Sequence, residues 1–236
     1  MSELFSIQLQ NRQQQGRDGV WLDLPTTTEQ VQAALRQIGI SSDNPQGLFI
    51  SGYFAEEEKR FAIPYNMVLA SNVDELNFLA SRLETLSAGE RAELNAALQA
   101  PQSELFSIGR ITDFPENVDY YVHLPDVRGP AQLGDYYLNR SGMVDMPEEW
   151  KGGIDTAQFG RYVAQQEQGA FTQYGYLVKS GDEWQKVYEG QPVPEEYRVL
   201  SFPAPEVLRD SANIPPPVQP ETEPQKVIPI ILNGKD

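Results

Sequence analysis

The hexapeptide SELFSI occurs twice in this chain, at residues 2–7 and again, unchanged, at residues 103–108. Its apolar and polar residues alternate, which is typical of a β-strand with one buried face. After each copy a polar stretch leads to a second alternating run that ends in Leu-Pro, at residues 20–25 and 118–125. We therefore predict that each copy is the first strand of a small sheet. The two sequences align only with one gap, and a match this short is also compatible with convergence on a common strand pattern.

The first copy begins a region with three predicted strands and one helix. Residues 4–9, 20–24 and 47–54 have strand patterns. Between the second and third, a Thr-rich capping pattern after Pro25 and apolar residues at helical spacing predict a helix that stops near Gly39. Residues 1–63 are thus expected to form a small antiparallel sheet with one helix.

The middle of the chain changes its period. Capping patterns begin at Asn72 and Ser87, and each is followed by apolar residues spaced i, i+3, i+4. Pro101 ends the second run. We predict a helical unit at residues 64–102.

The third region begins with the second SELFSI. Helices are predicted around residues 131–139 and 156–166, followed by a hairpin that pairs 170–179 with 183–189 across the turn 180–182. The last 35 residues contain eight prolines and predict an extended tail. Its apolar strip 226–232 has the pattern of a strand that adds to its own sheet or to a partner's. The predicted fold class is α+β: three small domains in a row (1–63, 64–102 and 103–200), elongated, with a Pro-rich tail at 201–236.

Negative charge is spread along the whole chain. There are 17 acids against 8 bases in residues 1–125, 12 against 7 in 126–200, and 5 against 3 in 201–236, for a net charge of −16. This distribution puts most of the charge on folded surface. Such a field repels nucleic acid and anionic membranes and attracts basic partners. Ordinary acidic solubility is the simpler interpretation of the same composition.

The residues for familiar site chemistries are sparse. The chain has no cysteine and a single histidine, His123, inside an alternating strand, where a structural role is the commoner one. No phosphate-binding loop, dinucleotide fingerprint or nucleophile elbow occurs. We find no signal peptide and no apolar run of membrane-spanning length. We therefore expect a cytoplasmic protein that is not an enzyme and needs no cofactor or metal. A hydrolase would require carboxylates that converge in a pocket.

Several stretches, taken in order, resemble the ArdA family of antirestriction proteins. The opening match is the run Trp-Leu-Asp-Leu-Pro at residues 21–25, and the helical segment 72–86 resembles the family's centre. The third region supplies LGDYY at 133–137, GIDTAQFGR at 153–161 and FTQYGY at 171–176. The likeness covers residues 4–178. Thr156-Ala157 stands where the family usually has Tyr-Glu, so one carboxylate is missing there.

The resemblance implies a function. Members of the family have three small domains, form an elongated dimer, mimic B-form DNA and inhibit type I restriction–modification enzymes by occupying their DNA groove. It further implies a gene carried by a mobile element or phage. The expected partner is thus such an enzyme, with no direct nucleic acid or membrane contact. The carboxylates expected to mimic phosphates are Glu56, Glu57, Glu58, Asp74, Glu75, Glu84, Glu90, Glu93, Asp113, Glu116, Asp119, Asp126, Asp135, Asp145, Glu148, Glu149 and Asp155.

A second interpretation stays open at this point. The chain could be an acidic interaction module, or an inhibitor of another DNA-binding defence or regulatory protein. The Pro-rich tail and its apolar strip favour this alternative, because no function of the family extends to residues 180–236.

Overall fold

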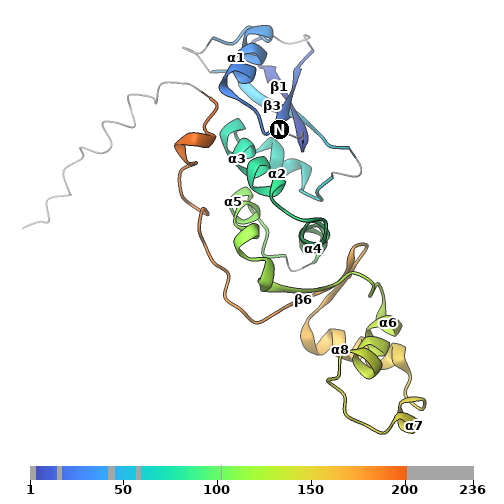
Figure 1. The fold of residues 1–236 in the computed structure, drawn as a ribbon. Coiled ribbons are helices and arrows are strands. Elements are labelled where there is room, and N and C mark those ends of the chain that lie inside the picture. Colours follow the sequence, from blue (N-terminus) through green and yellow to red (C-terminus); the bar gives the residue numbers. More distant parts are fainter. Residues whose placement is uncertain (1–3, 15–17, 42–45, 57–59, 102, 201–236) are drawn as a thin grey trace, which may run out of the picture. The chain divides into compact units, whose positions relative to one another are not determined.

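The computed structural model describes residues 4–14, 18–41, 46–56, 60–101 and 103–200 (Figure 1). Within them lie eight α-helices and two three-stranded sheets, which confirms the predicted α+β class. The strands are β1 Phe5–Asn11, β2 Val20–Leu24, β3 Leu48–Phe54, β4 Tyr121–Leu124, β5 Ala170–Thr172 and β6 Gly175–Lys179. The α-helices are α1 Thr28–Gln37, α2 Tyr65–Leu69, α3 Val73–Glu84, α4 Ala88–Gln99, α5 Ile108–Thr112, α6 Pro130–Asp135, α7 Glu148–Lys151 and α8 Thr156–Glu167. Short 3₁₀ turns occupy Phe114–Glu116, Val118–Tyr120 and Glu195–Tyr197, and a π-helical turn occupies Tyr136–Arg140. The three-domain division and its elongation stay predictions.

The first sheet follows the apolar alternation of the sequence. Its strands are antiparallel in the order β2-β1-β3, with β1 in the centre. Phe5, Ile7 and Leu9 of β1 are buried, whereas the residues between them are half-exposed. A bulge in the β1–β3 ladder lies between Gln8 and Leu9. The period-2 pattern thus fixes which face of this sheet enters the core.

Three helices start at the residues that the capping patterns indicate. Thr27, Asn72 and Ser87 are the N-caps of α1, α3 and α4, and each forms a reciprocal capping box with the residue three positions on. These boxes satisfy backbone N–H groups that have no partner within the helix. The expected stop at Gly39 is confirmed, since this glycine adopts φ +67° just after α1.

The second SELFSI is not a strand, and this prediction is wrong. Residues 103–107 form an irregular connection, and α5 begins at Ile108. Ser107 is the N-cap, and its side chain accepts a hydrogen bond from the Arg110 backbone N–H at 3.2 Å. Phe106 is 63% exposed. Ile108, the last residue of this copy, and Ile111 are buried and lie three positions apart, a spacing that favours a helix.

The second sheet has a different pairing from the predicted one. Its order is β4-β6-β5, all antiparallel, so β4 pairs with β6 and not with the second SELFSI. The predicted hairpin to residues 183–189 is wrong as well, since the real hairpin joins β5 to β6. Thr172 helps to close its turn by donating its hydroxyl to the Gly175 carbonyl at 2.9 Å. Gly175 has φ +132°, which a side chain would strain.

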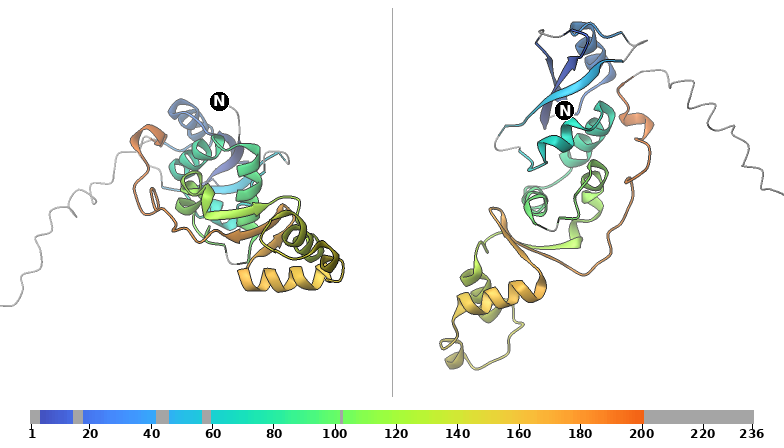
Figure 2. Two further views of the ribbon diagram at one scale, coloured as in Figure 1. Left: turned by 60° about the horizontal axis from the view of Figure 1, so that its bottom comes forward. Right: turned by 180° about the vertical axis from the view of Figure 1, so that it is seen from behind.

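Helices α6 and α8 lie side by side in both views (Figure 2). They match the helices predicted at 131–139 and 156–166, with the π-helical turn completing the first. Their contact depends on two glycines, because a Cβ at Gly134 would lie 1.9 Å from the Thr156 carbonyl oxygen and one at Gly160 would lie 1.8 Å from that of Pro130. Close backbone approach is thus built into this crossing. A small second core forms beside it, around Leu133 and Tyr176.

Residues 180–200, here called the strap, run from β6 back past α5 toward α3 (orange in Figures 1 and 2). Except for a short 3₁₀ turn, they contain no helix or strand, and buried polar side chains hold their backbone. Asn117 exchanges two hydrogen bonds with Gln185, at 2.7 and 3.0 Å. Asn77 donates to the Tyr197 carbonyl at 3.0 Å and accepts from the Thr26 N–H at 2.7 Å. The strap is therefore joined to α3 and, through Asn77, to the segment that follows β2. The predicted tail at 201–236 lies outside the described residues.

Candidate functional site

The candidate carboxylates fall into groups with different physical roles. Glu75, Glu90 and Asp155 cap helices: Glu75 and Glu90 close the boxes of α3 and α4, and Asp155 accepts from two backbone N–H groups of α8 at 2.9 and 3.0 Å. The hydrogen bonds from Ser87 hold the pKa of Glu90 below its usual value. These charges sit on rigid elements, where a mimic of a fixed phosphate array needs them.

Two candidates fasten the strap. Asp113 is fully buried, and its oxygens accept from the backbone N–H groups of Val187, Tyr188 and Glu189 at 3.3, 2.7 and 3.2 Å. Asp74, at the start of α3, accepts from two further strap N–H groups, those of residues 199 and 200, at 2.7 and 2.8 Å. Both carboxylates thus form hydrogen bonds that stabilise the fold, and Asp113 has no solvent-exposed surface with which to contact a partner.

Three more candidates are ion-paired. Glu116 binds Arg82 of α3, Asp135 lies 3.2 Å from Arg140, and Glu148 lies 2.6 Å from Lys151. A neighbouring cation reduces the field that each of these acids projects into solvent.

Glu93 on α4 differs from the other acids. Its Oε1 atom is buried and forms no hydrogen bond within the described residues. Burial, assisted by the nearby charges of Glu90 and Asp119, raises the pKa of Glu93 to about 7. The raised pKa makes this carboxyl a weaker source of negative charge near neutral pH than the exposed acids.

A final group is open to solvent. Asp119, Asp126, Asp145 and Glu149 are exposed, and within the described residues their side chains form no hydrogen bond or ion pair. Glu56 is exposed beyond β3, and Glu84 is half-buried at the end of α3. The remaining candidates, Glu57 and Glu58, lie outside the described residues.

The sequence reasoning missed further acids. Glu183, Glu195 and Glu196 of the strap are exposed and equally without a partner among the described residues. These residues could have been identified from the sequence, because they are acids in a polar stretch. They were not among the candidates because the family resemblance ends at residue 178. Glu104, Glu167 and Glu189 were also passed over and are structural: Glu167 accepts hydrogen bonds from Tyr137 and Tyr176. We name seven residues the open carboxylates: Asp119, Asp126, Asp145, Glu149, Glu183, Glu195 and Glu196.

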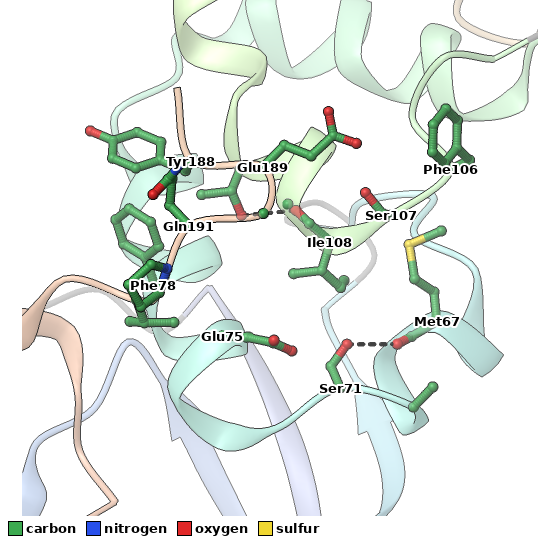
Figure 3. A pocket seen from close by; sticks show the side chains of 16 residues that line it. Met67, Ser71, Glu75, Phe78, Phe106, Ser107, Ile108, Tyr188, Glu189 and Gln191 are labelled. Carbon is green, nitrogen blue, oxygen red and sulfur yellow. Dashed lines mark hydrogen bonds between the residues drawn. The ribbon is translucent and has the colours of Figure 1, made fainter. Parts of the chain in front are cut away.

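A pocket of about 600 Å³ lies between α2, α3, the connection into α5, and the strap (Figure 3). Its lining combines apolar and aromatic side chains with polar ones, and its residues that are charged at neutral pH are Glu75 and Glu189. Elsewhere, His123 Nε2 lies 2.9 Å from the Tyr174 carbonyl oxygen, a contact within the second sheet. Among the described residues, no group of three or more His, Cys, Asp or Glu is arranged to hold a metal ion. None of the helices described here is long and apolar enough to cross a membrane.

Comparison with known proteins agrees with the resemblance found in the sequence. No curated protein matches the chain. A family model described as antirestriction protein (ArdA) matches residues 15–178, more than half of the chain and nearly all of the described helices and strands, and stops where the strap begins. The chain therefore belongs to the ArdA family of antirestriction proteins.

Proposed function

We propose that this protein inhibits a type I restriction–modification enzyme by presenting carboxylates in place of DNA phosphates. The family is one of inhibitors and not of enzymes. The observation that carries the proposal is the set of open carboxylates, because these exposed charges have no ion-pairing partner within the part of the chain that the structure describes. They come from several separate stretches between residues 119 and 196, and none of them lines the pocket of Figure 3.

The physical argument rests on how proteins bind DNA. Duplex DNA carries one negative charge per ~1.7 Å of axis, and its protein partners answer this with basic grooves. A net charge of −16 would draw such a groove to the inhibitor at long range. Association would then be fast and sensitive to salt, because exposed charges are screened beyond about 10 Å at 0.1 M ionic strength.

A competition assay tests the proposal. Labelled duplex DNA is bound to a purified type I enzyme, and the inhibitor is added while fluorescence anisotropy is followed. We expect displacement at micromolar inhibitor and low salt, and weaker displacement as salt rises. If the DNA stays bound under these conditions, the proposal is wrong. Capture of an unrelated host protein through residues 202–236 would instead favour the interaction-module alternative.

A variant set connects the effect to the open carboxylates. Neutralising five of them together (D119N, D126N, D145N, E149Q, E183Q) should raise the inhibitor concentration for half displacement about tenfold, which corresponds to about 1.4 kcal/mol. Any one of these changes alone should matter little. The matched control exchanges Asp and Glu at the same five positions, so that the charge is kept and only its position shifts. A folded neutral variant that still displaces DNA like the parent would contradict the proposal.

We also propose that the inhibitor acts as a homodimer and does not bind nucleic acid itself. The proposal of a homodimer rests on the family resemblance. The proposal that the protein does not bind nucleic acid rests on its negative field, which repels phosphates. Light scattering during size-exclusion chromatography measures the mass in solution against the 26.5 kDa of one chain.

A further inference from the structure

The pocket has three walls from different parts of the chain (Figure 3). Met67 and Phe78 come from α2 and α3, Phe106 comes from the second SELFSI, and Tyr188 comes from the strap. With a volume of about 600 Å³, the pocket can hold more than one large side chain. Aromatic rings and a methionine sulfur form good contacts with another aromatic group.

The walls are held in place without a ligand. Phe78 is buried, and its ring centroid lies 4.9 Å from that of Tyr188 and 4.6 Å from that of Tyr197. The strap wall is fixed by the three backbone hydrogen bonds to Asp113. Because the surface is pre-organised, a ligand does not have to order it.

The charge of the lining selects the ligand. The two lining residues that are charged at neutral pH, Glu75 and Glu189, are both acids. Glu189 is matched by Arg110 at 3.2 Å and by Lys186 at 3.6 Å. Glu75 points into the pocket, where its carboxylate accepts one backbone N–H at 3.4 Å and has no cation within ion-pairing distance among the described residues. One negative charge is therefore left beside an aromatic surface.

We propose that this pocket binds a partner segment in which an aromatic side chain lies next to an arginine. The aromatic ring would pack against Phe106 and Met67, and the guanidinium would pair with Glu75. This inference rests on the proposed function and deepens it. Charge on the open carboxylates gives encounter rate and orientation, whereas aromatic and arginine side chains in pockets usually supply most of the short-range binding energy.

Dipeptide binding tests the pocket without any restriction enzyme. The full chain, labelled with ¹⁵N, is titrated with Ac-Trp-Arg-NH₂ while amide shifts are recorded. We expect binding in the millimolar range, with shifts at Ser71, Ser107 and Gln191, and weaker binding of Ac-Trp-Glu-NH₂. Shifts elsewhere only, none at all, or equal affinity for the two peptides would overturn the proposal.

Two variants address the two parts of the ligand. Ala70 is an exposed lining residue with ordinary helical backbone angles, so Ala70→Trp can fill the pocket from its rim without entering the core. It should weaken Ac-Trp-Arg-NH₂ about tenfold. Glu75→Gln keeps the capping geometry and removes the charge, so it should abolish the preference for the arginine peptide. Asp18→Asn removes an exposed negative charge far along the sequence and outside the pocket lining, and it should leave peptide binding unchanged.

The same variants then enter the competition assay. Ala70→Trp should raise the dissociation rate of the enzyme complex several-fold and leave the association rate nearly unchanged. If the peptide binds but DNA is never displaced, the proposed function fails and the pocket stands. If DNA is displaced and Ala70→Trp dissociates like the parent, the pocket is not the anchor.

Discussion

The two SELFSI copies have one sequence and two structures. In the first, Phe5 and Ile7 are buried in the hydrophobic core. They belong to the central strand of the sheet, which pairs with a strand on each side. In the second, Phe106 lines the pocket with most of its surface exposed, and Ile108 starts a helix. What differs is the sequence that follows: Gln-Leu-Gln continues a period of two, whereas Gly-Arg-Ile-Thr places the next apolar residue three positions on. Six residues with strand propensity therefore do not determine a strand, since β-propensity depends strongly on context.

The two regions also differ in what holds them. The first copy is secured by apolar burial and strand pairing. The second copy leads into a helix whose C-cap is Asp113, and this buried acid binds the strap. The first region is thus stabilised by the burial of apolar side chains, and the second by hydrogen bonds from backbone N–H groups to a buried polar side chain. Substitutions can measure the contribution of each to the free energy of unfolding.

The largest expected difference is at the phenylalanines. Phe5→Ala should lower the free energy of unfolding by about 3–5 kcal/mol, because it leaves a cavity beside Tyr53 in the first core. Phe106→Ala, at the equivalent position, should cost about 1 kcal/mol or less, since the ring is exposed and its guanidinium neighbour, Arg110, lies 4.7 Å from its centroid. Urea unfolding followed by circular dichroism measures both. Equal losses would mean that the two copies are equivalent after all.

The fastening of the strap comes next. Asp113→Ala should cost about 3 kcal/mol or more, because three backbone N–H groups lose their acceptor in a buried site. Asp119→Ala changes an exposed acid nearby and should stay within about 0.5 kcal/mol of the parent. Urea midpoints and hydrogen exchange at residues 187–189 report the effect. A loss below 1 kcal/mol for Asp113→Ala would show that the strap is not held through this side chain.

The strength of local signals explains what could be predicted. The capped helices α1, α3 and α4 begin within a residue of the expected positions because their caps and apolar stripes lie in one continuous stretch. The pairing of β4 with β6 joins residues more than fifty positions apart, and the strap has no period at all. Its position depends on Asn77, Asp113 and Asn117, whose partners cannot be identified from sequence pattern.

The site was predictable to a similar degree. Net charge and motif order indicated the family and an acidic surface. Sequence alone could not separate Asp119, which is exposed, from Asp113, which is buried six residues earlier. That difference arises from tertiary contacts, as does the position of Glu75 in the pocket.

A smaller effect concerns the serines. Ser107→Ala removes the N-cap of α5 and should cost about 1 kcal/mol. Ser6→Ala, at the same place in the first copy, removes a hydroxyl that donates to Asp23 at 2.7 Å on the exposed face of the sheet and should cost about 0.5 kcal/mol or less. Thermal unfolding of both variants in one buffer is sufficient. If Ser6→Ala has the larger effect, capping is not what the second copy contributes.

The smallest effect depends on pH. Glu104 of the second copy receives a hydrogen bond from Lys179 at 2.6 Å, which holds the pKa of this acid below its usual value, and Arg110 adds to this at 3.2 Å. A depressed pKa in the folded state contributes stability above the unfolded pKa of about 4.5, and this contribution is lost as the pH falls through the folded value. Glu104→Gln should therefore cost about 0.5 kcal/mol at pH 7, a modest figure because the side chain is 31% exposed and solvent screens the pair, and nothing once both states are protonated.

The first copy supplies the control for this pH dependence. Glu3→Gln removes the same charge from the same hexapeptide. The free energies of unfolding of both variants are measured from pH 3 to pH 7. Loss of the contact with Lys179 destabilises the protein, whereas removal of one negative charge from a chain of net charge −16 reduces self-repulsion and stabilises it. Comparison of the two variants separates these effects. We expect the free energy of unfolding to fall below that of the parent as the pH rises only for Glu104→Gln. Parallel curves for the two variants would mean that the whole effect comes from net charge, and that the ion pair of Glu104 with Lys179 does not contribute to stability.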